Sequence, residues 1–537
     1  MQLRALALLA CATVIAAGCQ TRAQSSQIPD VKNTSVAAAL SAKPAFPVAE
    51  AVWSDVQRFY QQRGDDVAWG RDAALSAQGS KAVRVLERAA EHGLAAKDYG
   101  ATEISRLREN LGAQSGVEGR LAELDVALTT ALLALGRDVA LGRLKPDSVD
   151  KRWNAHRESP DFVATLSSLV NGNIDSWLDT VRPRHPEYAA LQKALADLRG
   201  DQEQGGWPRV PDAKFKARAS HPDVIALRQR LAASGELSSL ARASQSTEYD
   251  EDVQTAVRAF QETHGLKPTG LADVSTIASM NVPVEARIRQ VELNLDRWRW
   301  MPDDFGARHL IVNIPAFQLS ARENGKSVLG MRVVVGKHGM ETPLFSANMT
   351  TAVFSPYWNI PVSIAARETG PAIANDLYYL EKNDIEVRRV TKTGTQVVDP
   401  TTINWIDKAS LRGLSLRQRP GVKNALGRVK FLLPSEFDVY LHDTPTESLF
   451  SRETRAFSHG CVRLDEPEAL AKYVLRDQPE WDDARMKAAM NAGVEKQVKL
   501  TAPIPVFMVY FTSWVDETGH LHLVPDVYGY DARQAKF

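Results

Sequence analysis

The sequence predicts a multidomain α+β protein with a helical N-terminal region, a small three-helix module and a mainly-β C-terminal domain. Its 537 residues exceed what one hydrophobic core usually serves. Apolar residues recur at helical spacing up to about residue 283, and strand-like runs with turn signals follow from about residue 300. Basic and acidic residues are equal in number, 65 of each, so the chain lacks the basic excess typical of nucleic-acid binding.

The first 19 residues are predicted to be a leader. Arg4 precedes an apolar run over residues 5–17, which is too short for a permanent membrane span. The leader ends Ala-Ala-Gly-Cys at residues 16–19, which resembles a bacterial lipobox with Ala16 in place of the usual Leu. This resemblance implies a lipid on Cys19, and an ordinary cleaved signal is the alternative. Gln20, rather than Asp, follows the cysteine and resembles a signal for the outer membrane.

The chain has three cysteines, Cys11, Cys19 and Cys461. Cys11 lies inside the leader, and Cys19 would carry the lipid. Cys461 would then be a lone thiol without a disulfide partner in an exported protein, which makes it a candidate nucleophile.

Residues 20–48 are rich in Ser, Ala, Gln and Pro and predict a flexible tether. Residues 49–205 predict a helical domain, in which one stripe recurs at three- and four-residue spacing: Leu121, Leu124, Leu128, Leu132 and Leu135. No titratable cluster there suggests chemistry, so we interpret this domain as a scaffold. A Gly/Pro-rich linker precedes residues 215–283, where three short helices are predicted.

The C-terminal domain is predicted to span residues 300–537, after an amphipathic helix over 285–301. Strands at 309–321 and 326–335 flank Asn324-Gly325, a strong hairpin signal. Residues 371–420 form a less regular insertion. Further strands are expected at 349–355, 429–433, 437–442, 505–514 and 520–524, and helices at 466–476 and 481–492.

The chemistry is expected between residues 437 and 464. Strand alternation places Tyr440 and His442 on one face of the first segment. If the later segment Ser-His-Gly-Cys-Val-Arg-Leu (458–464) is also a strand, His459, Cys461 and Arg463 share a face. Packing of the two segments would bring His442 to Cys461.

These two segments resemble the signature of L,D-transpeptidases with a YkuD-type catalytic domain. The carrying residues are His-Asp-Thr-Pro at 442–445 and Ser-His-Gly-Cys at 458–461. Residues 291–302 (VELNLDRWRWMP) and 357–361 (YWNIP) resemble the large YcbB-like subgroup. That subgroup has a scaffold domain, a peptidoglycan-binding module and a lid-like insertion. Residues 253–266 (VQTAVRAFQETHGL) and the Gly270 turn resemble this module, with Thr269 where Asp is usual.

The resemblance implies that Cys461 is the nucleophile and His442 its general base. It implies an acyl-enzyme that joins peptidoglycan tetrapeptide stems by 3→3 cross-links in cell-wall biogenesis, without a cofactor and with sensitivity to carbapenems. The implied location is the periplasmic face of the envelope, lipid-anchored, at the outer membrane. An L,D-carboxypeptidase, an amidase that detaches proteins from the wall, and a non-catalytic wall-anchoring lipoprotein remain alternatives.

Other residues of the site have two interpretations each. The N–H groups of Gly460 and Cys461 are candidates for an oxyanion hole, and Gly460 would allow close approach of the chain. Ser458 and His459 are expected to support the loop, with a direct role for His459 as the alternative.

Tyr440 and Trp358 are core aromatics or walls of the site. Arg463 pairs with a carboxylate such as Asp465 or holds a substrate carboxylate. A zinc site of His442, His459 and Cys461 is disfavoured, because no HExxH motif or paired Cys accompanies them.

Overall fold

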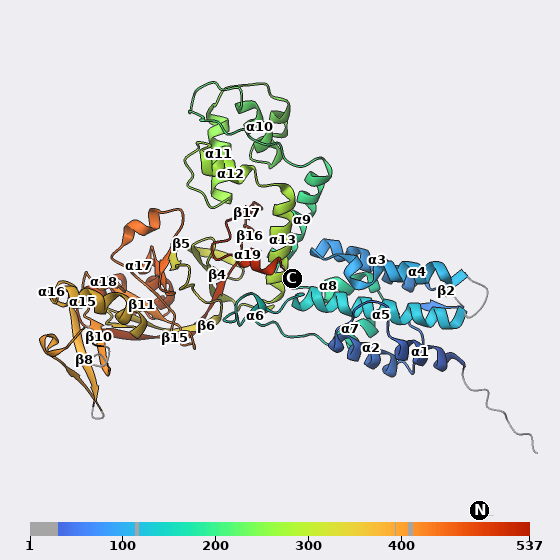
Figure 1. Cartoon of the computed structure of the whole chain (residues 1–537), viewed down its shortest axis with the longest axis horizontal. Coiled ribbons are helices and arrows are strands. Elements are labelled where there is room, and N and C mark those ends of the chain that lie inside the picture. Colours follow the sequence, from blue (N-terminus) through green and yellow to red (C-terminus); the bar gives the residue numbers. More distant parts are fainter. Residues whose placement is uncertain are drawn as a thin grey trace, which may run out of the picture.

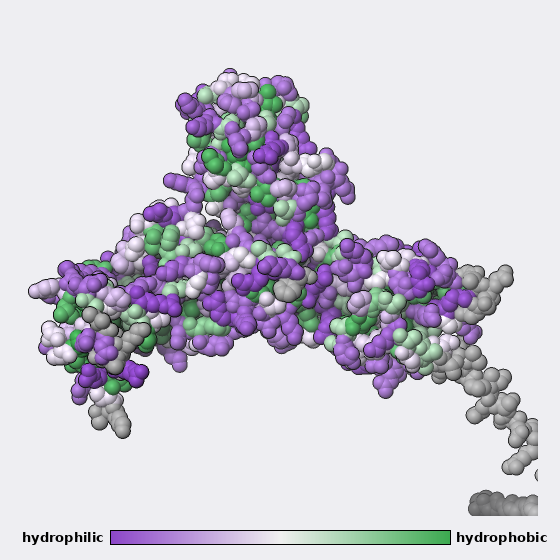
Figure 2. Space-filling view, viewed as in Figure 1, coloured by the Kyte–Doolittle hydropathy of each residue, from purple (hydrophilic) through white to green (hydrophobic). Residues whose placement is uncertain are grey.

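The computed structural model describes residues 31–536 except 73, 113–116, 392–393, 406 and 408–411. The leader, Cys19 and the first part of the tether lie outside the described residues. Three bodies meet near the middle of the molecule: a helical one, a small module and a β-rich one (Figure 1). Hydrophilic residues predominate over the visible face of all three (Figure 2). Among the described residues, no helix is long and apolar enough to cross a membrane.

The helical body is built around α5 (Val117–Leu141), and the five leucines of the predicted stripe are all buried in its core. Residues on the other sides of α5, such as Ala122 and Leu133, are buried too, because helices cover it all round. The surrounding helices are α1 (Val31–Ala42), α2 (Glu50–Gln62), α3 (Ala77–Glu87), α4 (Ala101–Glu109), α7 (Phe162–Val170) and α8 (Trp177–Val181).

Helix α1 corrects the prediction that residues 20–48 form a flexible tether throughout. Val36 and Ala39 are buried in the scaffold core, and Leu40 packs against it. Their spacing of three and four residues makes one apolar stripe in an alanine-rich segment, and alanine favours helix. The composition resembles a linker, but the periodicity is that of a helix.

The small module consists of α10 (Val224–Ala233), α11 (Glu251–Thr263) and α12 (Val274–Met280), as predicted. Asp250 and Asp273 accept hydrogen bonds from the first turns of α11 and α12, as N-caps do. Gly270 has φ +71°, a conformation that favours glycine at this turn.

Helix α13 (Val284–Arg299) was expected to be amphipathic and is instead buried on nearly every side. It lies between α9 (Pro186–Glu203) and the C-terminal segment of the β-rich body. Its buried polar residues have partners, including Arg297 with Asp531 at 2.6 Å and Arg299 with Asp296 at 3.0 Å. The polar residues of this helix, which suggested a solvent-exposed face, therefore make contacts between the bodies.

The β-rich body has a nine-stranded sheet of order β13-β5-β14-β12-β11-β6-β15-β3-β4. The expected strand 309–321 is two antiparallel strands, because the chain turns at Phe317 with φ +52°. The turn at Asn324-Gly325 is confirmed, with positive φ at both residues. The strands are β3 (Arg308–Asn313), β4 (Gln318–Glu323), β5 (Lys326–Gly336), β6 (Ser346–Phe354), β11 (Val429–Leu432), β12 (Tyr440–His442), β13 (Ala456–Ser458), β14 (Val462–Leu464) and β15 (Lys496–Val509).

The two expected C-terminal helices are α17 (Pro467–Leu475) and α18 (Asp483–Asn491), and both contribute buried residues to the core of this sheet. The expected strand over 505–514 begins earlier, because β15 already pairs with β6 from Lys496 on. A separate hairpin of β16 (Ser513–Val515) and β17 (Leu521–Leu523) follows.

The insertion is larger and more regular than predicted. It forms a second sheet of order β7-β10-β8-β9, from β7 (Trp358–Ile360), β8 (Ile385–Thr391), β9 (Gly394–Val397) and β10 (Leu414–Gln418). This lid has its own core, to which Ile360, Ile373 and Leu416 contribute. It begins at Trp358, before the expected boundary at 371, because β7 pairs with β10 across some 55 residues of chain. No local signal in the sequence marks this pairing, so the prediction missed it.

Candidate active site

The register of three neighbouring strands places the predicted site residues on one face of the large sheet. On β12 and β14, which run parallel, Leu441 pairs with Val462 and His442 with Arg463. Leu441 and Val462 point into the hydrophobic core, so their neighbours in sequence face the opposite side. Extended by one residue, the register sets Cys461 level with Tyr440. His442 then lies roughly 8 Å from Cys461 between Cα atoms by strand geometry, which side chains can bridge.

Cys461 follows a sharp turn rather than continuing a strand, which corrects the expectation of one strand over 458–464. β13 ends at Ser458 and β14 begins at Val462. Gly460 between them has φ +114°, which glycine adopts readily. A Cβ at Gly460 would meet nothing closer than 3.8 Å, so its conformation, not a close approach of the chain, requires glycine.

Hydrogen bonds hold this turn from both sides. Ser458 Oγ accepts from the Gly460 N–H at 3.1 Å and donates to the Cys461 carbonyl at 2.5 Å. Thr342 donates to the Gly460 carbonyl at 2.8 Å. Because Ser458 takes the Gly460 N–H, that group is not directed at a substrate, which leaves the Cys461 N–H as the remaining oxyanion candidate of the two.

His442 is buried and is oriented by its own chain. Its Nδ1 lies 2.5 Å from the Asp443 carbonyl oxygen, which can only accept, so Nδ1 carries the proton and Nε2 a lone pair. Asp443 is itself held by the N–H groups of Arg428 and Thr444. Burial, followed by the positive charges of Arg463 and Lys430, lowers the pKa of His442 to about 3. His442 is thus a neutral imidazole in the tautomer that a general base needs.

Tyr440 and Trp358 line the thiol. Burial raises the pKa of the Tyr440 hydroxyl, and Cys461 and Trp358 also influence it, so both side chains lie near this hydroxyl. Trp358 comes from β7 of the lid, so the lid reaches the surroundings of Cys461 through this tyrosine. Because both aromatic residues lie near the thiol, the geometry favours Tyr440 and Trp358 as walls of the site.

Burial raises the pKa of the Cys461 thiol above its ordinary value.

His459 points away from Cys461 and toward the lid. Its Nε2 lies 2.6 Å from Oε1 of Glu368, in the helical turn Ala365–Thr369 at the start of the lid. Lys337 lies 3.7 Å from the same carboxylate oxygen. The geometry favours a supporting role for His459. Within the described ranges, no group of three His, Cys, Asp or Glu side chains is arranged to hold a metal.

Arg463 does not pair with Asp465, which instead binds Arg332 at 2.7 Å. Sequence reasoning missed Lys430 of β11, which pairs with His442 in the register and whose ammonium lies 5.8 Å from the centre of the Tyr440 ring. A lysine inside the otherwise apolar strand VKFL was the available signal.

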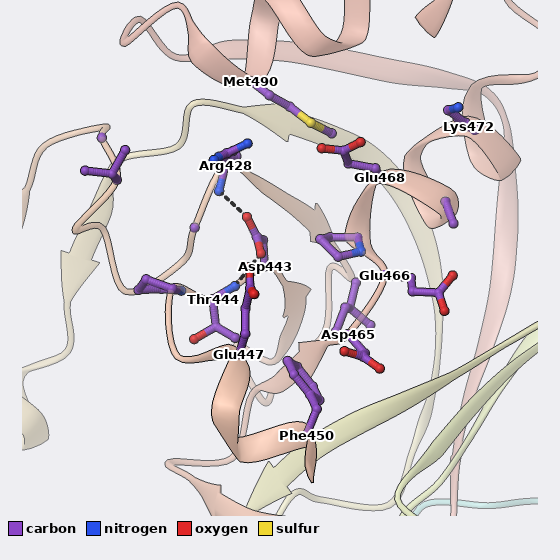
Figure 3. A pocket seen from close by; sticks show the side chains of 17 residues that line it. Arg428, Asp443, Thr444, Glu447, Phe450, Asp465, Glu466, Glu468, Lys472 and Met490 are labelled. Atoms are coloured by element: carbon purple, nitrogen blue, oxygen red, sulfur yellow. Dashed lines mark hydrogen bonds between the residues drawn. The ribbon is translucent and has the colours of Figure 1, made fainter.

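A cavity of about 490 Å³ opens at the C-terminal ends of β12 and β14, away from Cys461. Figure 3 shows Glu468, Lys472 and Met490 on one side of it and Phe450 on the other. It adjoins the loop after His442, through Asp443. A Cβ at Gly427 would approach the Asp443 carboxyl carbon to 2.3 Å, so this loop depends on that glycine.

Comparison with known proteins agrees with this architecture. Residues 307–490 match the model of the L,D-transpeptidase catalytic domain, YkuD; residues 54–195 match a scaffold domain; and residues 220–280 match a "putative peptidoglycan binding domain". Residues 307–490 thus carry a YkuD-type L,D-transpeptidase catalytic domain. The chain carries the scaffold and peptidoglycan-binding domains beside that domain.

A curated relative from Haemophilus influenzae, named a "putative L,D-transpeptidase", is 33% identical over 248 residues, which are 46% of this chain and 49% of the relative. The chain thus spans about half the length of that relative. Solved structures of L,D-transpeptidases match as well. An L,D-transpeptidase from Mycobacterium smegmatis has 14% identity and a TM-score of 0.20, over 38% of this chain and 58% of its own. An L,D-transpeptidase from Stackebrandtia nassauensis has 14% identity and a TM-score of 0.22, over 56% of this chain and 96% of its own.

Proposed function

We propose that this protein is a cysteine-dependent L,D-transpeptidase that forms 3→3 cross-links between peptidoglycan stem peptides. The observation that carries the proposal is the pairing of β12 with β14. It sets a neutral His442, with its lone pair on Nε2, on the same face as the thiol of Cys461. That arrangement suits an acyl transfer in which a base takes the thiol proton as sulfur attacks.

In the first half-reaction, the sulfur of Cys461 bonds to the carbonyl carbon of diaminopimelate in a tetrapeptide stem. His442 Nε2 takes the thiol proton, and the Cys461 N–H supports the oxyanion. The carbon–nitrogen bond to the terminal D-Ala then breaks. D-Ala leaves as the amine with the proton from His442, and a thioester remains on Cys461.

In the second half-reaction, the side-chain amine of diaminopimelate on a neighbouring stem attacks the thioester. His442 takes a proton from this amine and returns it to the sulfur as the thioester breaks. The product is an amide between two diaminopimelate residues, and the thiol is regenerated. Protein groups alone supply this chemistry, and the free thiol of Cys461 is expected to be acylated by carbapenems, whose carbonyl mimics the donor amide.

The proposed location is the periplasmic face of the outer membrane, with a lipid on Cys19. The leader pattern before Cys19 supports this, and the module over residues 220–280 is suited to hold the enzyme at the wall. Fractionation of envelopes from cells that carry the wild type or Cys19→Ser tests the anchor. Wild-type protein that is free in the periplasm with an unmodified N-terminus would contradict it.

Incubation with purified tetrapeptide muropeptides, followed by mass spectrometry, tests the reaction, with Cys461→Ala as control. A 3→3 dimer together with released D-Ala is the expected product. Tripeptides without dimers would indicate a carboxypeptidase. Release of a muropeptide from a wall-linked protein would indicate an amidase. No change in any substrate would leave a non-catalytic wall-anchoring protein.

A further inference from the structure

Two cations flank the catalytic histidine in one row across the sheet. Lys430 of β11 pairs with His442 of β12, and His442 pairs with Arg463 of β14. Residues paired in this way share one face of the sheet, and neighbouring strands are about 4.8 Å apart. Lys430 and Arg463 therefore begin roughly 10 Å apart, on either side of His442, and both have long side chains.

Both cations act on the space above the thiol. Each interacts favourably with the thiolate form of Cys461, so both lie near the sulfur. The Lys430 ammonium donates to the Tyr357 carbonyl at 3.2 Å and lies 5.8 Å from the centre of the Tyr440 ring, and Tyr440 itself lies near the thiol. The side chains of Lys430, Arg463 and Tyr440 are only partly buried, so a ligand can reach them.

Neither cation has a carboxylate partner among the described residues. In the part of the chain that the structure describes, no ion pair joins Lys430 or Arg463 to an acid, and Nε of Arg463 is buried without a hydrogen bond. Glu495 attracts Lys430 only from a distance, and its carboxylate accepts from the N–H of Tyr357 at 2.8 Å. Two partly desolvated cations without an anion are costly to keep, which points to an anionic ligand.

We propose that Lys430 and Arg463 together bind the free carboxylate of the terminal residue of the donor peptide and so select donors by their C-terminus. This rests on the proposed function. In the donor, a single Cα separates the scissile amide from that carboxylate. When the carbonyl carbon meets Cys461, the carboxylate must lie close to the thiol, where the two cations act.

The same contact connects donor binding with proton transfer. In the free protein the two cations oppose a positive charge on His442. A bound carboxylate offsets them, so the imidazole accepts the thiol proton more readily once a donor is in place. Lys430 and Arg463 are thus specificity-determining residues that also tune the base.

Two alkylating reagents of the same size test the cation pair without any peptide. Iodoacetate carries a carboxylate and iodoacetamide does not, and intact-protein mass spectrometry measures how fast each modifies Cys461. We expect the ratio of the iodoacetate rate to the iodoacetamide rate to fall roughly tenfold in Lys430→Gln and in Arg463→Gln, the loss of one charge-assisted contact of about 1.4 kcal/mol. Lys499→Gln, an exposed lysine of β15, is the matched control and should keep the wild-type ratio.

Lys430→Arg and Arg463→Lys retain the charge and should keep most of the ratio, which separates loss of charge from loss of folding. An unchanged ratio in both neutral variants, with the fold intact by thermal melt, overturns the proposal. So does an equal fall in Lys499→Gln.

Peptide donors separate this proposal from the proposed function. Wild-type protein should be acylated at least roughly tenfold faster by a tetrapeptide stem with a free terminal carboxylate than by its C-terminal amide. Equal acylation by both would refute the carboxylate site and leave the transpeptidase standing. Acylation by neither, with the iodoacetate preference intact, would refute the transpeptidase and leave an anion site beside the thiol.

Discussion

In the free protein, Cys461 is expected to be a neutral thiol beside a neutral imidazole, not a thiolate beside an imidazolium. The pKa of His442 is lowered to about 3, and burial raises that of Cys461 above its ordinary value of about 8.5. At pH 7 the thiolate fraction should therefore be below about 3%. A donor must then bind before the proton moves.

The measurement is a pH titration of the ultraviolet absorbance of the thiolate, with Cys461→Ala as the blank. The midpoint should lie above about pH 8.5. His442→Ala should leave it nearly unchanged, because the histidine carries no charge over this range. The reasoning is refuted if thiolate is already abundant at about pH 6, or if His442→Ala raises the midpoint by more than about one unit, since both results would reveal an ion pair.

Three further predictions concern acylation and stability. His442→Ala should slow acylation of Cys461 by about 10² to 10⁴, as loss of a general base does, whereas His459→Ala should lose less; stopped-flow measurements with thermal melts decide this. A carbapenem should add to Cys461 in intact-protein mass spectrometry, and an equal adduct on Cys461→Ala would remove it as nucleophile. Burial lowers the pKa of His92 to about 2, so below about pH 6.5 this residue gains a proton only in the unfolded chain. The free energy of unfolding therefore decreases as the pH is lowered. His92→Gln should reduce the loss of unfolding free energy between pH 7 and pH 5 by about 2 kcal/mol, measured by urea unfolding.

The sequence predicted the elements that local patterns define. The leucine stripe of α5, the Asn324-Gly325 hairpin and the three helices of the module are periodicities or turn signals contained in a few residues. It also identified both residues of the candidate acyl-transfer pair, His442 and Cys461, because the motifs that carry them are short and contiguous.

Features that depend on pairing across the chain were missed. Trp358 belongs to the lid only because β7 pairs with β10. Lys430 enters the site only because β11 lies beside β12. Helix α13 has the polar pattern of an exposed helix, and only its position between two bodies buries that pattern. Propensity and periodicity carry no information about partners so distant in sequence.

The lid contacts the surroundings of Cys461 at two independent points. Trp358 lies beside the Tyr440 side chain near the thiol, and Glu368 binds His459, two residues before Cys461. An outward movement of the lid would break both contacts. It would separate Trp358 from Tyr440 on one side and Glu368 from His459 on the other. The lid therefore does more than cover the site, because it contacts Tyr440 and His459, two residues that lie beside Cys461.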